Sequence, residues 1–175
     1  MRFAVRVLLV SIILVISSAV MGQETDAPSG VDLERFSDIP VERLEDGGFI
    51  FGDPDAPVTI VEFADFLCPH CQDYEEIMDQ FVEDYVATGM ARFEYRYMPI
   101  IDENYSPLLA AISECAGEAD LFWPAHRALY QIGRARVQDS FIVSNVAEWI
   151  ETDQVALENC IPQADQFVED VQLGD

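Results

Sequence analysis

Two cysteines separated by two residues are the most chemically informative feature of this sequence. Cys68, Pro69, His70 and Cys71 follow one another directly. Thiols at this spacing can form and break a disulfide with each other, or supply half of a zinc site. The other two cysteines are isolated in the sequence, and a purely structural bond in so small a ring would stabilise the fold very little. We therefore interpret the pair as redox active, with no bound metal or cofactor.

The residues around the pair predict a strand before it and a helix after it. Residues 58–66 form a nearly continuous apolar run, which is typical of a strand buried on both faces. Cys68 lies where the helix begins, and free N–H groups and the helix dipole at that position favour its thiolate form. After Pro69, apolar side chains recur at helical spacing, at Tyr74, Ile77, Met78, Phe81, Val82 and Tyr85.

The flanking segments extend this unit. Apolar and charged residues alternate over residues 91–98, which predicts a second strand and therefore a βαβ unit. The intervening helix is expected to end at Gly89, a natural C-cap. Residues 47–52 predict a short edge strand, and residues 41–44 predict a short helix.

After the βαβ unit, the sequence predicts helices only. Two of them have an N-cap candidate, Ser106 and Asp120. The predicted helices begin near Ser106, Asp120, Phe141, Thr152 and Pro162.

The chain is strongly acidic. It has 175 residues, with 33 Asp and Glu against nine arginines and no lysine, and its formal net charge is −24. Such a surface repels nucleic acid, which excludes nucleic-acid binding as a function. We interpret the charge as a solvated acidic surface, with a docking surface for a basic partner as the alternative. Half of the residues are hydrophobic, enough for one domain with a core.

The N-terminus has the features of a secretion signal. Arg2 and Arg6 precede an apolar stretch, residues 7–20, and no acid occurs before Glu24. We predict a signal peptide at residues 1–22, with an uncleaved membrane anchor as the alternative. Either form predicts a periplasmic or extracellular protein, in a compartment that permits disulfides. Residues 23–47, which follow the signal peptide, are predicted to form an acidic linker.

Several motifs together resemble the DsbA-like branch of the thioredoxin superfamily. They are Cys-Pro-His-Cys at residues 68–71, the segment from Gly52 to Phe63, Glu-Cys-Ala-Gly-Glu at residues 114–118, Leu-Phe-Trp at residues 121–123, and His126. The resemblance implies an α/β thioredoxin-like fold with an inserted helical domain. It assigns residues 48–99 to the N-terminal βαβ half, residues 100–162 to the insert and residues 163–175 to the start of the return.

The resemblance also indicates what the chain lacks. No proline follows Pro162, and the chain ends at Asp175. The C-terminal strands of that family, and the cis-proline loop that faces the cysteine pair, are therefore expected to be missing. We expect a truncated protein or a fragment.

By the same resemblance, Cys68 is the attacking thiol and Cys71 the resolving thiol of a redox-active disulfide. His70 contributes a nearby proton and a positive charge. Glu62, six residues before Cys68, is a buried group that transfers protons. The alternatives from the residues alone are an exposed histidine without a role and an acid that faces outward.

The resemblance extends to residues outside the cysteine motif. Glu75 and Arg92 are expected close to the buried acid. Cys115 and Cys160 lie on separate predicted helices and are expected to form a structural disulfide, with two buried reduced thiols as the alternative. His126 lies among apolar residues, and we interpret it as core packing rather than as a ligand.

The resemblance implies an exported protein thiol–disulfide oxidoreductase, and it favours a dithiol oxidase that introduces disulfides into secreted proteins. A reductase or isomerase of the same family is one alternative. A non-catalytic acidic binding module, with an inert or metal-binding cysteine pair, is an alternative from another class. The implied partners are protein substrates with cysteine thiols and a membrane reoxidase of the DsbB type.

Overall fold

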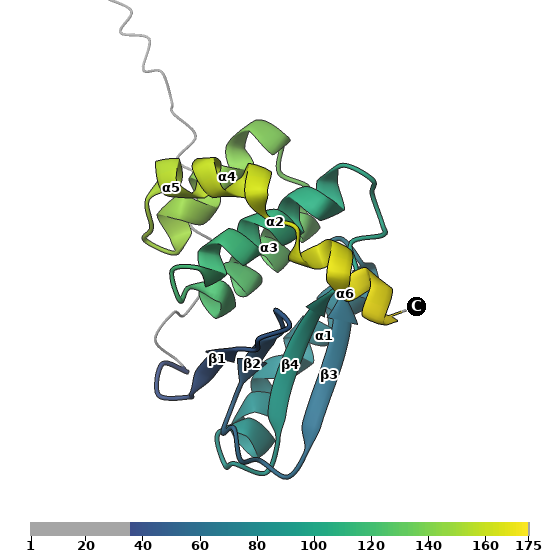
Figure 1. The fold of residues 1–175 in the computed structure, drawn as a ribbon, viewed down its shortest axis with the longest axis vertical. Helices are drawn as coiled ribbons and strands as arrows, with labels where there is room; N and C mark the ends of the chain where they lie inside the picture. Colours follow the sequence, from purple (N-terminus) through teal and green to yellow (C-terminus); the bar gives the residue numbers. More distant parts are fainter. Residues whose placement is uncertain (1–35, 175) are drawn as a thin grey trace, which may run out of the picture.

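The computed structural model describes residues 36–174, which form a four-stranded sheet and a group of helices above one end of it (Figure 1). The predicted signal peptide, residues 1–22, and linker residues 23–35 lie outside the described residues. No helix within residues 36–174 is long and apolar enough to cross a membrane. The elements are β1 (Val41–Arg43), β2 (Phe49–Phe51), β3 (Thr59–Ala64), α1 (Pro69–Phe81) with a π-helical extension (Val82–Val86), β4 (Arg92–Tyr97), α2 (Tyr105–Gly117), α3 (Phe122–Ala135), α4 (Asp139–Trp149), α5 (Gln154–Cys160) with a 3₁₀ turn (Ile161–Gln163), and α6 (Gln166–Gly174).

The predicted βαβ unit is confirmed. The strand order is β1-β2-β4-β3, and β3 runs parallel to β4, with α1 as the crossover between them. The alternation in β4 places Phe93, Tyr95 and Tyr97 in the core, where all three are buried. The helix that starts at Pro69 ends before Gly89, whose positive φ of 73° suits a glycine.

The N-terminal strands differ from the prediction. Residues 41–44, predicted as a helix, contain β1 instead. β1 pairs antiparallel with β2, with Val41 opposite Phe51 and Arg43 opposite Phe49. This pairing outweighs the weak helix propensity of so short a segment. β2 in turn pairs with β4 on its other side and is fully buried. The strand predicted at residues 47–52 is therefore the shorter β2, and it is an internal strand rather than an edge strand.

β3 is less buried than its apolar sequence predicts. Ile60, Val61 and Phe63 are 37%, 48% and 38% exposed, so the expected burial on both faces is wrong. Within the described part of the chain, β3 pairs on one side only, with β4. An apolar run thus indicates a strand without specifying what covers it.

The helices follow the predicted order but are capped differently. Ser106 lies inside α2, and its hydroxyl accepts a hydrogen bond from the N–H of Asp102 at 3.0 Å. The Asp102 carboxylate accepts the N–H of Tyr105 at 2.8 Å and so takes the capping role. Asp120 does not cap α3, because Leu121 occupies the N-cap position and Asp120 has a left-handed φ of 61°.

A buried ion cluster joins α6 to β4, and α6 lies across the carboxyl end of that strand (Figure 1). Asp170 accepts the N–H of Tyr97 at 2.9 Å and lies 3.3 Å from the guanidinium of Arg96. Arg96 also binds Glu94 at 2.7 Å and Asp46 at 2.8 Å. Arg96 is only 4% exposed and Asp170 is 0% exposed. A buried charge is tolerated only with such partners, since it has lost its hydration.

We expect Asp170→Ala to lower the free energy of unfolding by about 3 kcal/mol, since it removes a buried partner of Arg96 and the acceptor of the Tyr97 N–H. Urea unfolding measures this loss. Glu169→Ala changes an exposed residue of the same helix and should alter stability little. Equal losses in the two variants would contradict the assignment.

Candidate active site

The two cysteines lie at the junction between β3 and α1. Cys68 occupies the N-cap position of α1, with φ −68° and ψ 118°, and Pro69 is the first helical residue. Cys71 lies one turn further along the helix. Both are half-buried thiols in the structure. Because Cys68 is at the N-terminus of a 13-residue helix, it lies at the positive end of the helix dipole.

The turn that connects β3 to Cys68, residues 65–68, is held by several elements. We refer to it as the 65–68 turn. The side chain of Gln72 in α1 donates a hydrogen bond to the carbonyl of Phe66 at 2.8 Å. The Phe66 ring is buried against Tyr130 of α3 and Tyr95 of β4, with ring centroids 5.0 and 5.6 Å away. The turn that leads to Cys68 is therefore held at Phe66 by residues of α1, α3 and β4.

Helix α3 approaches the 65–68 turn closely at Gly133. A Cβ atom at this position would lie 2.3 Å from the carbonyl oxygen of Phe66. Such a distance is a steric overlap, so the close packing of α3 on the turn requires a glycine here.

Cys71 has the properties of the less reactive thiol of the pair. Burial raises the pKa of the Cys71 thiol to about 12. A hydrogen bond from the backbone N–H of Asp65 lowers this pKa but does not outweigh burial, and the neighbouring Cys68 and Glu62 raise it further. In its reduced form Cys71 is therefore protonated at neutral pH.

Glu62 lies half-buried on β3, opposite Tyr95 of β4 in the strand register. Burial raises the pKa of the Glu62 carboxyl to about 7. The charge of Glu62 also acts on Cys71 and on Tyr74, so the acid lies within electrostatic range of the cysteine pair. A carboxyl that titrates near neutral pH can both give and accept a proton at this location.

Glu75 lies close to Glu62, as the resemblance implied. Burial raises the pKa of Glu75 to about 7, and the Glu62 carboxylate adds to this effect, while the nearby Arg127 opposes it. Glu75 Oε2 lies 3.9 Å from Nδ1 of His126. Burial lowers the pKa of His126 to about 3, so this histidine is neutral and packs among aromatic rings. The contact between Glu75 and His126 could not be predicted from the sequence, because no local pattern relates α1 to α3.

Arg92 does not approach Glu62, contrary to expectation. Its guanidinium donates to Thr59 Oγ1 at 2.8 Å and to the carbonyl of Pro54 at 3.0 Å. The register pairs Arg92 with Thr59, three residues from Glu62 and about 10 Å away along the strand. His70 is exposed at the start of α1, and its role stays a prediction.

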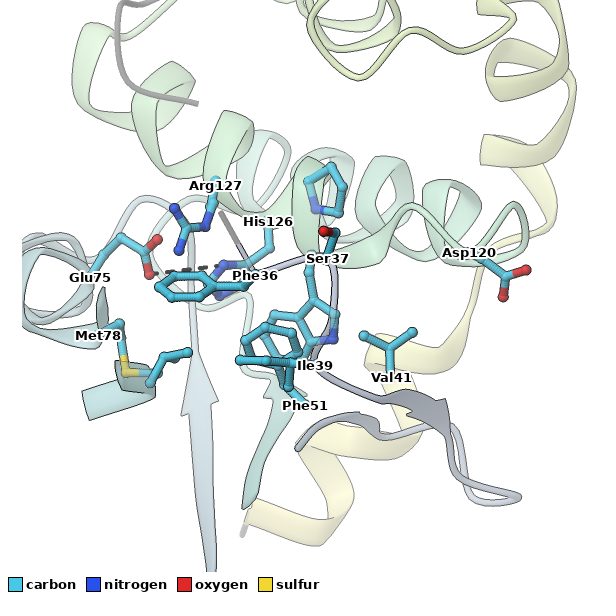
Figure 2. A pocket seen from close by; sticks show the side chains of 13 residues that line it. Phe36, Ser37, Ile39, Val41, Phe51, Glu75, Met78, Asp120, His126 and Arg127 are labelled. Atoms are coloured by element: carbon cyan, nitrogen blue, oxygen red, sulfur yellow. Dashed lines mark ion pairs between the residues drawn. The ribbon is translucent and has the colours of Figure 1, made fainter. Parts of the chain in front are cut away.

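A pocket of about 200 Å³ opens between α1, α3 and the segment around β1 (Figure 2). Phe36, Trp123 and Arg127 form part of its wall, together with Glu75 and His126. In Figure 2 the Glu75 carboxylate points toward His126. The side chain of Glu75 lines this pocket and is therefore accessible to solvent from it.

A model of the thioredoxin family matches residues 45–172 of the chain. The chain belongs to the thioredoxin family. A structure of α-DsbA1 from Wolbachia pipientis superimposes with a TM-score of 0.64 and 22% identity, covering 71% of this chain and 66% of that chain. The predicted α/β thioredoxin-like fold with added helices is therefore confirmed.

Curated relatives of this thioredoxin-family chain are longer proteins. A probable disulfide bond formation protein D from Bacillus cereus is 29% identical over 131 residues, which cover 71% of this chain and 56% of that protein. A Na(+)/H(+) antiporter NhaA 3 from Salinispora tropica is 35% identical over 97 residues, which cover 55% of this chain and 14% of that protein. The chain thus spans about half of the first relative and a small part of the second.

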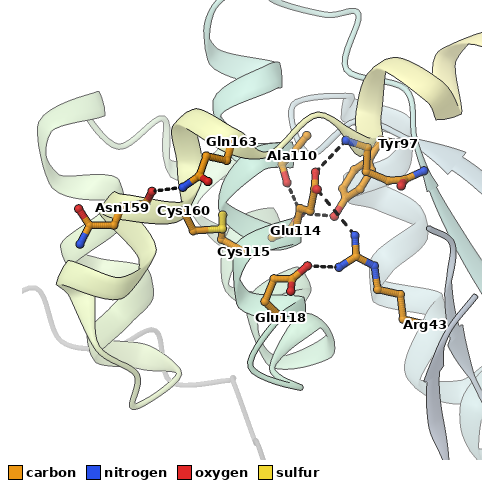
Figure 3. Close-up of a disulfide and its surroundings, with 11 residues drawn as sticks. Arg43, Tyr97, Ala110, Glu114, Cys115, Glu118, Asn159, Cys160 and Gln163 are labelled. Atoms are coloured by element: carbon orange, nitrogen blue, oxygen red, sulfur yellow. Dashed lines mark hydrogen bonds and ion pairs between the residues drawn. A yellow bond between two sulfur atoms is a disulfide. The ribbon is translucent and has the colours of Figure 1, made fainter. Parts of the chain in front are cut away.

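The second cysteine pair of this thioredoxin-family chain forms a disulfide among the helices (Figure 3). Cys115 on α2 and Cys160 at the end of α5 have their sulfur atoms 2.07 Å apart. Closing a loop of this length contributes about 4 kcal/mol in the chain-entropy model. Next to Cys115, Glu114 lies 3.7 Å from Arg43 of the β1 strand and accepts the N–H of Gln166 at 3.1 Å. Within residues 36–174, no three His, Cys, Asp or Glu side chains are grouped as metal ligands.

We expect Gly133→Ala to reduce thiol–disulfide exchange at Cys68, because the new methyl group must displace the carbonyl of Phe66 and with it the 65–68 turn. Exchange with a small aromatic disulfide, followed by absorbance, measures the effect. Ala135→Ser adds one atom at an exposed position of the same helix and serves as the control. Equal exchange rates in both variants and the unaltered chain would show that the close packing is irrelevant to the cysteines.

The raised pKa of Glu62 predicts how stability depends on pH. The folded chain binds the Glu62 proton more tightly than the unfolded chain, whose carboxyl has an ordinary pKa near 4.5. The contribution of Glu62 to the free energy of unfolding should therefore fall as pH rises from about 4.5 to about 7, whereas the contribution of His126, whose pKa is lowered to about 3, rises with pH up to about 6.5. Urea unfolding at several pH values measures the slope, from which Glu62→Gln should remove the falling contribution. Glu148→Gln, at an exposed carboxyl of α4, should keep the full slope.

Proposed function

We propose that the chain is a protein thiol–disulfide oxidoreductase in which Cys68 and Cys71 alternate between two thiols and a disulfide. The observation that carries this proposal is the asymmetry of the pair. Cys68 lies at the start of α1, where the helix dipole stabilises a thiolate, whereas burial raises the pKa of Cys71 to about 12. A pair with one thiol at a helix N-terminus and one buried, protonated thiol suits disulfide exchange.

We further propose that the reaction runs in the oxidising direction, as a dithiol oxidase. The similarity to a probable disulfide bond formation protein D supports this direction. A helix start that stabilises the Cys68 thiolate also supports it, because stabilising the reduced form makes the disulfide a stronger oxidant.

In the first step, a substrate thiolate attacks Sγ of Cys68 in the oxidised pair. A bond forms between the substrate sulfur and Cys68, and the Cys68–Cys71 bond breaks, leaving the electron pair on Cys71. The Cys71 thiolate is strongly basic, since the pKa of its thiol is about 12. Glu62, with a pKa of about 7, is the nearby group that supplies the proton, and Glu75 links it to the solvent of the pocket.

In the second step, another thiolate of the substrate attacks the substrate sulfur of the mixed disulfide. The substrate disulfide forms, and Cys68 leaves as the thiolate that the helix dipole stabilises. The substrate is oxidised by two electrons, and the pair is reduced to two thiols. A membrane reoxidase of the DsbB type is the proposed partner that restores the disulfide.

We propose that this reaction occurs outside the cytoplasm, in the periplasm or beyond the cell. Disulfides persist in such oxidising compartments. The disulfide between Cys115 and Cys160 supports that environment, because it would add to stability only where it stays oxidised. The predicted signal peptide at residues 1–22 agrees with export.

The reduction potential of the pair, measured by equilibration with glutathione, tests the function. We expect a strongly oxidising value, with exchange reduced to the background rate in Cys68→Ser, because the attacked sulfur is gone. Cys71→Ser should instead accumulate a mixed disulfide at Cys68, since no resolving thiol remains. Exchange that survives in Cys68→Ser would rule out the mechanism, and a weakly oxidising potential would favour a reductase or isomerase.

A further inference from the structure

The pocket between α1, α3 and the segment around β1 has an apolar wall that suits an aromatic ring (Figure 2). Three rings contribute to this wall, namely Phe36, Phe51 and Trp123. The centroids of Phe51 and Trp123 are 4.9 Å apart. The volume of about 200 Å³ exceeds the cavity of about 150 Å³ that holds benzene in another protein. The pocket is therefore large enough for one aromatic ring with a short substituent.

The polar wall of the pocket contains a carboxyl group without a cationic partner. The side chain of Glu75 is 18% exposed, and within the described part of the chain its only ion-pair contact is with His126, at 3.9 Å. Burial lowers the pKa of His126 to about 3, so this histidine is neutral and brings no charge to the contact. A buried carboxylate in such surroundings favours a ligand that carries a positive charge.

Arg127 also lines the pocket, but its charge is already balanced. Its guanidinium donates to Oδ1 of Asp79 at 2.5 Å and lies over the ring of Phe36, 5.0 Å from the centroid. Asp120 adds a second acidic side chain to the wall of the pocket, and the net charge of the whole chain is −24. The pocket therefore attracts cations rather than anions.

The neutral imidazole of His126 adds a further hydrogen-bond acceptor to the polar wall. One ring nitrogen of a neutral histidine carries a proton, and the other accepts. The 3.9 Å between Glu75 and His126 is too long for a hydrogen bond, and Nε2 of His126 has no partner among the residues that the structure describes. An ammonium group has three N–H donors and can therefore donate to both side chains.

We propose that this pocket is a binding site for a small aromatic amine, with its ring against Phe51 and Trp123 and its ammonium group at the Glu75 carboxylate. A neutral aromatic compound lacks the charge that pairs with Glu75, and an alkyl ammonium lacks the ring that the apolar wall accommodates. The pocket is lined by neither cysteine of the 68–71 pair, so binding there does not require disulfide exchange.

Benzylammonium is the probe, and the indole N–H signals of the chain labelled with nitrogen-15 report where it binds. The chain has two tryptophans, and only Trp123 lines the pocket, so Trp149→Phe assigns the two signals. We expect a saturable shift of the Trp123 signal, with little change at Trp149. Benzyl alcohol, which has the ring without the charge, and butylammonium, which has the charge without the ring, should bind about tenfold more weakly.

Glu75→Gln keeps the size of the side chain and removes its charge, so it should weaken the binding of benzylammonium about tenfold. Asp73→Asn is the matched control, because it removes one acidic group from an exposed position of the same helix. It should keep the affinity of the unaltered chain. Phe36→Ala removes a ring from the apolar wall and should also weaken binding, which provides a second test if Glu75→Gln does not fold.

The affinity should also rise with pH, because only ionised Glu75 pairs with the ammonium. Burial raises the pKa of Glu75 to about 7, so we expect the rise between about pH 6 and about pH 8, and we expect none in Glu75→Gln. Glu62→Gln should move the rise to lower pH, since the Glu62 charge helps to raise this pKa. The other titratable or charged groups that act on Glu75 stay unchanged, namely Asp79 on α1, and His126, Arg127, Tyr130 and Arg134 on α3.

Three results with the unaltered chain would overturn the site: no saturable shift at Trp123, an equal shift at Trp149, or equal affinities for benzylammonium, benzyl alcohol and butylammonium. An equal loss in Glu75→Gln and Asp73→Asn would also overturn it, because the probe would then respond only to the overall acidity of the chain. None of these outcomes depends on whether the cysteine pair exchanges disulfides, so the site and the proposed oxidoreductase function are tested separately.

Discussion

The parallel pairing of β3 with β4 brings the carboxyl ends of both strands to the same end of the sheet. At that end, β3 continues into the 65–68 turn and Cys68, while β4 continues into the loop before α2. The cysteine pair and the entrance to the helical group are therefore neighbours by topology. The hydrogen bond from the N–H of Ile101 to the Asp65 carboxylate joins that turn to that loop, while Gln72 and Gly133 contact the turn at Phe66.

The sequence predicts elements whose stability is local and misses features that depend on tertiary contacts. The alternation in residues 91–98 and the helical spacing after Pro69 are strong enough to predict the βαβ unit. Residues 41–44 carry no such pattern, and they form a strand only because β2 is available beside them. The same limit explains why Glu62 could be predicted near the cysteines but the displaced Arg92 could not, because strand register is a property of the folded sheet.

The buried charges divide into two groups with different physical effects. Arg96 and Asp170 satisfy each other and hold α6 against β4, so their charges stabilise the fold. Glu62 and Glu75 are buried beside each other, and burial raises both pKa values to about 7. Their environment resists ionisation, which costs stability near neutral pH. Buried acids within one small domain therefore have opposite effects on stability, according to whether a basic group pairs with them.

The partly exposed β3 strand affects how the protein behaves at high concentration. In the described part of the chain, one edge of β3 has no partner strand, and Val61 and Phe63 leave apolar surface next to it. Such an edge can pair with the same edge of a second molecule. The net charge of −24 opposes that encounter by mutual repulsion, whose range falls from about 30 Å at 0.01 M salt to about 3 Å at 1 M. The repulsion between acidic surfaces therefore opposes self-association more strongly in dilute buffer than in concentrated salt.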